Sequence, residues 1–367
     1  MKVRRRRPLS EPVARAALAL CRIEAATALL DRVRPLRFAD EVARLAAGFA
    51  RGERLPPRLE YAPRASLTEA RRELDDLART HEVGDVEEQL LAGRARELSL
   101  DAALAESVGL PAFRGLAARR FPLPDAADRA EALAHELLQA AASPDDAEED
   151  LHLSDDPSDG QSLWSEISRR LSRERWPVRI EVVPGLVSLA AVADGVVRVR
   201  AGARLTSRVA RRVALHEVEG HVRPRVLGRA LGGVFVAGTA RCAEDEEGRA
   251  IWLEARAGLL DPERMRTLAR RYLAAASVRH GAELWDTVEL LAATDATAAV
   301  SIELACRVHR GGGLARELIY LTGYVRAARE LTARPELDAI QQSGRVSLQA
   351  CALLRDSLEL DDHGDVV

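Results

Sequence analysis

Two histidines and a glutamate lie close together in the stretch A-L-H-E-V-E-G-H-V-R-P, residues 214 to 224. His216, Glu217 and His221 form the pattern H-E-x-x-x-H, one residue longer than the helical zinc motif H-E-x-x-H. Each residue of an α-helix advances by about 100°, so histidines five apart diverge by about 140° instead of sharing a face. The pattern therefore indicates a zinc site only on a distorted helix, and on a regular helix it is a polar face.

A π-turn would realign the two histidines, because its hydrogen bonds join residues five apart, and such turns are frequent at functional sites. Gly220 lowers the cost of unusual backbone angles, and Pro224 weakens the helix at the same end. We therefore predict a locally widened helix that ends before Pro224, with His216 and His221 bound to one zinc ion.

A catalytic zinc ion has three protein ligands and an open position for water. The next acidic cluster, A-E-D-E-E-G at 243 to 248, begins another predicted helix, and four acids compete there for the third ligand position: Glu244, Asp245, Glu246 and Glu247. An acidic first turn is also ordinary for a helix. Spacing alone does not separate the four.

The chemistry of a bound zinc ion would make Glu217 the general base, because it directly follows the first ligand. Glu219 is the rival base, on a different side of the helix. We expect His309 to pack or be exposed. The remaining histidines have no partner at ligand spacing and are predicted to be structural or solvated: His81, His135, His152, His280 and His363.

Several segments resemble the microtubule-associated tyrosine carboxypeptidases and their bacterial relatives. These are H-E-V-E-G-H at 216 to 221, E-E-G at 246 to 248, R-V-H-R-G-G-G at 307 to 313 and L-I-Y-L-T-G at 318 to 323. The likeness runs from about residue 40 to the C-terminus. It implies His216, His221 and Glu247 as zinc ligands and Glu217 as the base.

This chain departs from the family pattern near the implied metal site. Relatives commonly have H-E-x-G-T-H, where this chain has Glu219-Gly220, and E-G-L-A, where it has Arg249 in place of the leucine. Relatives also tend to carry an aromatic residue and a Lys-Asp pair shortly before the tyrosine that corresponds to Tyr320. This chain has Leu-Ala-Arg-Glu at 314 to 317 instead. We therefore do not transfer to this chain the removal of a C-terminal tyrosine from tubulin, which is the reaction of the eukaryotic relatives.

Arg307, Arg310 and Tyr320 lie within the family-like segments and have suitable chemistry. An arginine binds a free α-carboxylate through paired, charge-assisted hydrogen bonds, and a tyrosine hydroxyl donates to a developing oxyanion. We predict substrate binding by Arg307 and Arg310 and a catalytic role for Tyr320. Arginines are abundant in this chain, so an ordinary surface position is the alternative for each.

The elements that must hold these residues are mainly helical. Residues 1–142 are predicted to be a helical region, 143–162 an acidic, exposed loop or linker that could act as a lid, and 163–367 a zinc metallopeptidase core, packed together as one unit. β-branched runs at 178–184, 186–192 and 196–201 predict strands, with a turn at Asp194-Gly195. We expect an α+β, mainly helical, gluzincin-like fold with a small antiparallel sheet next to the active-site helix.

The composition is that of an ordinary globular protein, with 47% hydrophobic residues and a net charge of -3 over 367 residues. It gives no indication of nucleic acid binding, and no run approaches the roughly 18 apolar residues of a membrane span. We expect a cytoplasmic protein with four free cysteines and a solvated N-terminal run at Arg4 to Arg7. The oligomeric state is left open.

These features together predict a zinc-dependent metallopeptidase that acts, like a carboxypeptidase, on the C-terminus of a peptide or protein. Two rivals remain at this point. One is a zinc amidase that processes a small modified peptide or metabolite. The other is a noncatalytic binding or regulatory protein that keeps the fold, which the changes at Glu219 and Arg249 favour and the intact set of ligands and base opposes.

Overall fold

The computed structural model of the chain describes residues 2–124, 129–140, 150–193 and 195–361. The chain forms two compact units, each built from segments that are separate in sequence. The first unit consists of Met1–Leu9, Ala142–Arg264 and Arg326–Val367, and the second of Ser10–Ala141 and Met265–Val325. The sequential regions 1–142, 143–162 and 163–367 do not coincide with these units, because residues 265–325 cluster with the N-terminal helices.

The second unit is helical in its described parts, as the sequence predicts for this region. Its helices are α1 (Glu11–Thr27), α2 (Leu29–Arg32), α3 (Phe38–Ala50), α4 (Thr68–Thr80), α5 (Val86–Glu106), α6 (Ala112–Arg120), α7 (Ala130–Gln139), α14 (Leu284–Ala292) and α15 (Ala298–Gly313). The chain passes between the units within α13 (Pro262–Arg279) and α16 (Leu318–Ala333). A buried cluster with Leu45, Val288 and Ile302 at its centre holds α3, α14 and α15 together.

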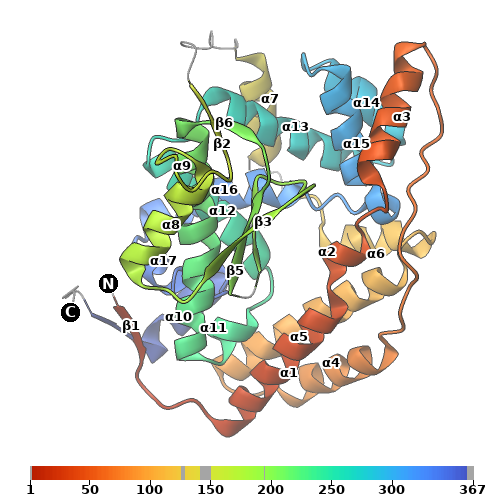
Figure 1. The fold of residues 1–367 in the computed structure, drawn as a ribbon. Helices are drawn as coiled ribbons and strands as arrows, with labels where there is room; N and C mark the ends of the chain where they lie inside the picture. Colours follow the sequence, from red (N-terminus) through yellow and green to blue (C-terminus); the bar gives the residue numbers. More distant parts are fainter. Residues whose placement is uncertain (1, 125–128, 141–149, 194, 362–367) are drawn as a thin grey trace. The chain divides into compact units, whose positions relative to one another are not determined.

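The described part of the first unit contains three small sheets. Strand β1 (Lys2–Arg5) pairs antiparallel with β7 (Leu358–Asp361), so the red and blue ends of the chain meet in Figure 1. Strand β2 (Leu151–Leu153) pairs antiparallel with β6 (Arg204–Thr206). The third sheet has the order β3-β5-β4 and is formed by β3 (Arg179–Val183), β4 (Ala190–Ala193) and β5 (Val196–Arg200).

The structure corrects three expectations about these strands. The sheet predicted as antiparallel is mixed, because the chain after β3 crosses to the far side of β5, which leaves β3 and β5 parallel and only β4 and β5 antiparallel. The basic N-terminal run is not wholly a solvated tail, since Arg4 and Arg5 belong to β1 and the Arg5 Nε donates to the Leu231 carbonyl at 2.7 Å. The acidic segment 143–162 contains β2 in its described part. Asp194 of the predicted turn lies outside the described residues.

The remaining helices of the first unit are α8 (Leu163–Glu174), α9 (Ser207–Leu215), the π-helix η2 (His216–Val222), α10 (Arg223–Leu231), α11 (Val234–Ala237), α12 (Cys242–Arg256), α17 (Glu336–Gln341), α18 (Leu348–Leu354) and the 3-10 turn η3 (Arg355–Ser357). The Thr206 hydroxyl accepts from the Val209 amide and so begins α9. Val197 and Val199 of β5 share one buried cluster with Ala214 of α9 and Val218 of η2. This cluster fixes one face of the motif helix, so the opposite face can carry polar groups.

The fold is mainly helical, with 63% of residues in helices and the rest of its regular structure in small sheets, which confirms the expected α+β class. Within the described residues, no helix has both the length and the apolar character needed to cross a membrane.

Candidate metal centre

The H-E-x-x-x-H stretch forms a π-helix, as the sequence predicts. Residues His216–Val222 make up η2, which continues directly from α9 and into α10. The Arg223 amide, at the end of η2, donates to the Val218 carbonyl five residues earlier. The predicted helix end before Pro224 is wrong, because η2 runs directly into α10, which contains Pro224 and continues to Leu231.

Gly220 allows η2 to approach α12 closely. A Cβ atom added to Gly220 would lie 2.6 Å from the Cβ atom of Ala250 and 3.3 Å from its Cα atom. Gly220 is not among the glycines with a positive φ, so the expected reason for a glycine here, unusual backbone angles, is wrong. Ala250 lies three residues after Glu247 on α12, so this close approach brings Glu247 toward η2.

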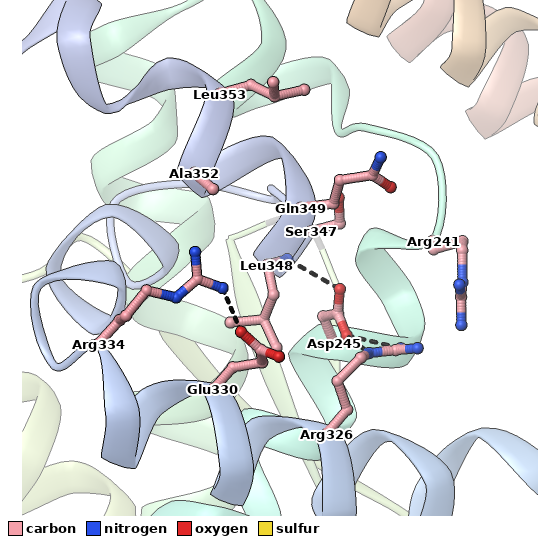
Figure 2. A pocket seen from close by; sticks show the side chains of 10 residues that line it. All are labelled: Arg241, Asp245, Arg326, Glu330, Arg334, Ser347, Leu348, Gln349, Ala352 and Leu353. Carbon is pink, nitrogen blue, oxygen red and sulfur yellow. Dashed lines mark hydrogen bonds and ion pairs between the residues drawn. The ribbon is translucent and has the colours of Figure 1, made fainter. Parts of the chain in front are cut away.

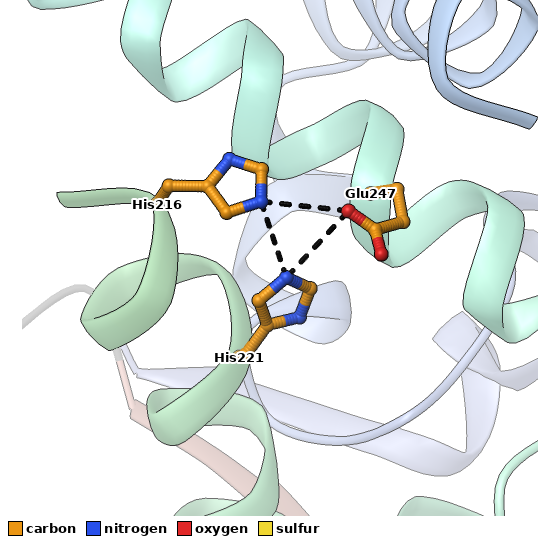
Figure 3. Close-up of side chains that lie close together, drawn as sticks. All are labelled: His216, His221 and Glu247. Carbon is orange, nitrogen blue, oxygen red and sulfur yellow. Dashed lines mark hydrogen bonds and ion pairs between the residues drawn. The ribbon is translucent and has the colours of Figure 1, made fainter. Parts of the chain in front are cut away.

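His216, His221 and Glu247 converge on one point (Figure 3). The two Nε2 atoms lie 3.3 Å apart. Glu247 Oε2 is 3.4 Å from the His216 Nε2 atom and 3.7 Å from the His221 Nε2 atom. No other group of three potential ligand side chains comes together in this way in the part of the chain that the structure describes.

These distances fit a zinc ion. A tetrahedral zinc with bonds of about 2.0 to 2.1 Å places its ligand atoms about 3.3 to 3.4 Å apart, close to the three separations found here. Two imidazole nitrogens and one carboxylate oxygen are also the ligand set of a known class of catalytic zinc sites, in which the fourth position stays open. Donor type and spacing therefore both suit the metal.

Carboxylates outside the three candidate ligands orient both imidazole rings. The His216 Nδ1 atom lies 2.7 Å from Glu254 Oε1, and the His221 Nδ1 atom lies 2.7 Å from Glu246 Oε1. A histidine that binds a metal through Nε2 commonly donates its Nδ1 proton to such a carboxylate, which fixes the tautomer and the ring orientation. Both histidines are thus held with Nε2 turned toward the candidate metal position.

The surroundings of the two rings favour positive charge. Burial works against protonation of His216, but Glu247 and Glu254 outweigh it and raise its pKa to about 9. Burial also opposes protonation of His221, and Glu246 and Glu247 together raise its pKa to about 10. Three carboxylates thus surround two imidazoles. A divalent cation in this place would replace the protons of the histidines, because a ligating imidazole must be neutral.

Partners on neighbouring elements separate the four acids of α12. Glu244 pairs with Arg241 and Arg326. Asp245 accepts from the Leu348 amide and pairs with Arg326, and Figure 2 shows these contacts beside a cavity of about 360 Å³. Glu246 binds His221 and lies 2.5 Å from Arg225. Among the four, only Glu247 lies in the His216–His221 cluster.

The two candidate bases differ in their surroundings. Glu217 is partly exposed, and its side chain makes no hydrogen bond or ion pair with any described residue. Glu219 is 2.7 Å from the Arg223 Nε atom, and a second arginine, Arg173, lies 3.7 Å from its other oxygen. The arginines hold the Glu219 carboxylate in place, whereas no side chain of the described residues holds that of Glu217. The local contacts therefore favour Glu217 over Glu219.

Arg307, Arg310 and Tyr320 belong to the second unit, where Glu317 connects the two arginines. The Arg307 Nε atom donates to Glu317 Oε1 at 2.8 Å, and Arg310 Nη2 is 3.6 Å from the same oxygen. Burial raises the pKa of Glu317, but Arg310 and Arg307 reverse this and bring it to about 2. The Tyr320 hydroxyl accepts from the Arg316 Nη1 atom at 2.9 Å.

Arg310 differs from Arg307 in how its guanidinium is used. Its Nε atom is buried and has no hydrogen-bond partner in the described part of the chain. Burial lowers the pKa of Arg310, and the neighbouring Arg307 lowers it further. A buried donor without a partner is costly, so the Arg310 Nε atom favours a further acceptor besides Glu317. Arg310 is therefore the better placed of the two to bind a carboxylate.

Of the remaining described histidines, His81, His152 and His309 make structural contacts, whereas His135 and His280 are exposed. His81 pairs with Glu88 at 3.0 Å and His152 with Asp159 at 2.6 Å. The His309 Nε2 atom lies 2.9 Å from the Thr287 hydroxyl oxygen, and burial lowers the pKa of His309 to about 4. These contacts agree with packing roles, as expected. His363 lies outside the described residues.

The family of the chain follows from a match over most of its length. A family model described as "Microtubule-associated tyrosine carboxypeptidase" matches residues 47–361, which include the complete candidate metal centre. The chain belongs to the microtubule-associated tyrosine carboxypeptidase family. The family name describes a carboxypeptidase, which is a hydrolase that acts at a C-terminal peptide bond. No curated protein and no solved structure was found to match the chain.

The structure adds residues that the motifs did not reveal. Glu254 follows Glu247 by seven residues, or two helical turns, so the two carboxylates share a face of α12, and this spacing could have indicated a supporting role. Glu246 is one of the four acids at 244 to 247, but its contact with His221 Nδ1 cannot be predicted from that cluster. Glu317 and Arg316 lie between the predicted substrate residues, and sequence alone carried no signal for their contacts.

Proposed function

We propose that this member of the microtubule-associated tyrosine carboxypeptidase family is a zinc-dependent metallopeptidase with a gluzincin-like core, and that it hydrolyses a C-terminal peptide bond. The observation that carries the proposal is the convergence of His216, His221 and Glu247 at tetrahedral spacing on a π-helix and its neighbour. The two Nδ1 atoms turned toward Glu254 and Glu246 support it, because a merely polar helical face has no need to orient its rings.

His216, His221 and Glu247 would hold the metal in this proposal. A bound zinc ion supplies Lewis acidity, which polarises a carbonyl group and lowers the pKa of water into the neutral range. Glu217 takes the proton of the attacking water and passes it to the amine that leaves. Its carboxylate has no arginine or histidine partner among the described residues, so it is available for this transfer.

Arg310, Arg307 and Tyr320 supply the proposed contacts to the substrate. Arg310 binds the free α-carboxylate of the peptide, and its Nε atom, which has no other partner among the described residues, donates to it. Arg307 holds the Glu317 carboxylate in place, and this carboxylate balances the positive charge near Arg310. The Tyr320 hydroxyl donates to the oxyanion that forms at the attacked carbonyl.

The proposal is tested with Glu217→Gln beside Glu219→Gln as the matched control. We expect Glu217→Gln to keep its zinc but to hydrolyse short peptides about 10² times more slowly, or slower still. Glu219→Gln should keep most of the activity. Peptides with a free C-terminus should be cleaved and their C-terminal amides should not.

Each other outcome of this experiment contradicts a stated part of the proposal. Equal cleavage of free and amidated peptides would favour an amidase of another specificity. Full activity in Glu217→Gln would remove Glu217 as the base. Zinc binding without hydrolysis of any peptide would favour a noncatalytic protein that keeps the fold.

A further inference from the structure

The register of the π-helix leaves one backbone carbonyl without its usual partner. The Arg223 amide donates to Val218, five residues back, so it does not donate to the carbonyl of Glu219 as it would in an α-helix. In the continued π register, the partner of the Glu219 carbonyl would be the amide of residue 224. Residue 224 is proline and has no N–H. Neither helical register supplies a main-chain donor at this point.

Arg249 takes the place of the missing donor. Its Nη1 atom donates to the Glu219 carbonyl at 2.8 Å, and its Nε atom donates to Asp338 Oδ1 of α17 at 2.7 Å. Only 3% of the Arg249 side chain is exposed, so these bonds form away from water. A carbonyl that lacks a hydrogen-bond partner away from water destabilises the fold, and this arginine supplies the partner.

The position of Arg249 in the fold gives the contact its importance. Arg249 follows Glu247 by two residues on α12, so one short segment carries both a candidate zinc ligand and the donor to η2. The carbonyl that it binds lies between His216 and His221, the two residues that only the π register brings together. A return of η2 to α-helical geometry would turn the two histidines apart.

Glu219 and Arg249, the two departures from the family pattern closest to the metal ligands in sequence, are therefore joined in one arrangement. Arg249 binds the main chain of Glu219, and the Glu219 side chain binds Arg223, whose amide closes the π-turn. This arrangement explains how both changes coexist with an intact set of metal ligands.

We infer that Arg249, held by Asp338, is a positioning residue that maintains the π-turn and so aligns His216 and His221 on the zinc ion. The inference rests on the proposed zinc site. Arg249 acts through the Glu219 carbonyl and does not touch the metal ligands.

The test compares Arg249→Leu, Pro224→Ala and the double variant with the unchanged chain. Leucine removes the donor to the Glu219 carbonyl, and alanine at 224 restores a main-chain N–H that can serve the same carbonyl. Zinc affinity is measured by competition with a chromophoric chelator, and cobalt(II) absorption reports the geometry of the site. Arg256→Leu, at an exposed position of the same helix, is the matched control.

We expect Arg249→Leu to weaken zinc binding about 10- to 100-fold, which is the usual effect of removing a partner outside the ligands, and to alter the cobalt spectrum. Pro224→Ala alone should change little, the double variant should recover most of the affinity, and the control should match the unchanged chain. An unchanged affinity in Arg249→Leu would overturn the inference. So would an equal loss with and without Pro224→Ala, because Arg249 would then act by another route.

A second measurement separates this inference from the proposed function. Amide hydrogen exchange of residues 216–223 in the metal-free protein reads the π-turn without any zinc. We expect faster exchange in Arg249→Leu and slower exchange again in the double variant. An unchanged chain that fails to bind zinc would contradict the proposed function, whereas exchange that does not respond to Arg249→Leu would contradict the inference.

Discussion

Removal of the Glu254 charge tests whether the carboxylates around the two histidines support a metal. Glu254 has no exposed side-chain surface, and its Oε1 atom is 2.7 Å from the His216 Nδ1 atom. Its other oxygen lies 3.3 Å from Arg264 and 3.5 Å from Arg212. Glu254→Gln keeps the shape and one acceptor oxygen but leaves two arginines without a buried counter-charge. The perturbation therefore acts on His216 without changing any ligand.

The expected loss follows from these contacts. Removing an outer partner of a metal-bound histidine typically lowers metal affinity 10- to 100-fold, or by about 1.4 to 2.8 kcal/mol. The glutamine oxygen still accepts the hydrogen bond from His216 Nδ1, so the loss of zinc affinity in Glu254→Gln should be about 10-fold. Glu254→Ala removes the hydrogen-bond acceptor as well, so its loss of zinc affinity should be about 100-fold.

The assay is a zinc competition titration at constant pH, with the melting temperature of the metal-free protein measured separately. Glu244→Gln is the matched control, because Glu244 also lies on α12 and pairs with two arginines but makes no contact with either histidine. We expect this control to keep its zinc affinity within about twofold. Unchanged affinity in both Glu254 variants would refute the reasoning that this carboxylate orients His216.

Three further predictions concern packing, pH and the substrate. Gly220→Ala should weaken zinc binding, since its new Cβ atom would lie 2.6 Å from Ala250, and Ala250→Gly in the same chain should restore binding; failure to restore it would contradict the packing argument. Burial holds the pKa of His309 at about 4, so this histidine takes up its proton in the unfolded chain before it does so in the folded chain as the pH falls. The free energy of unfolding, measured by urea titration, should therefore fall by up to about 3 kcal/mol between pH 6.5 and pH 4. His309→Gln should flatten this dependence of the unfolding free energy on pH, and an unaltered dependence would contradict the prediction. Arg310→Leu should raise KM for peptides with a free C-terminus and leave amidated peptides unaffected, and an equal change for both would exclude a role for Arg310 in carboxylate binding.

Local patterns were sufficient to predict the centre of the candidate site. The five-residue spacing of His216 and His221 requires a π-turn for joint binding, and the turn is present. This step needed only helical periodicity. The choice of Glu247 among four acids came from the family resemblance, because the partners that separate these acids come from α10, α16 and α18.

Contacts between distant segments were beyond the reach of the sequence. The pairing of Arg249 with Asp338 joins residues 89 positions apart, and the parallel pairing of β3 with β5 depends on a crossover that no turn signal marks. The reason for Gly220 was also missed, because a close approach of two helices leaves no trace in the local pattern. The role proposed for Arg249 depends on the π register of η2, which no pattern around residue 249 indicates.

The most direct test of the central claim is the zinc content of protein purified without added metal, measured by mass spectrometry beside Glu247→Ala. We predict about one zinc per chain in the unchanged protein and a loss of most of it in the variant. A metal-free chain that cannot be loaded with zinc, or a variant that retains the full amount, would contradict the assignment of His216, His221 and Glu247 as the metal centre.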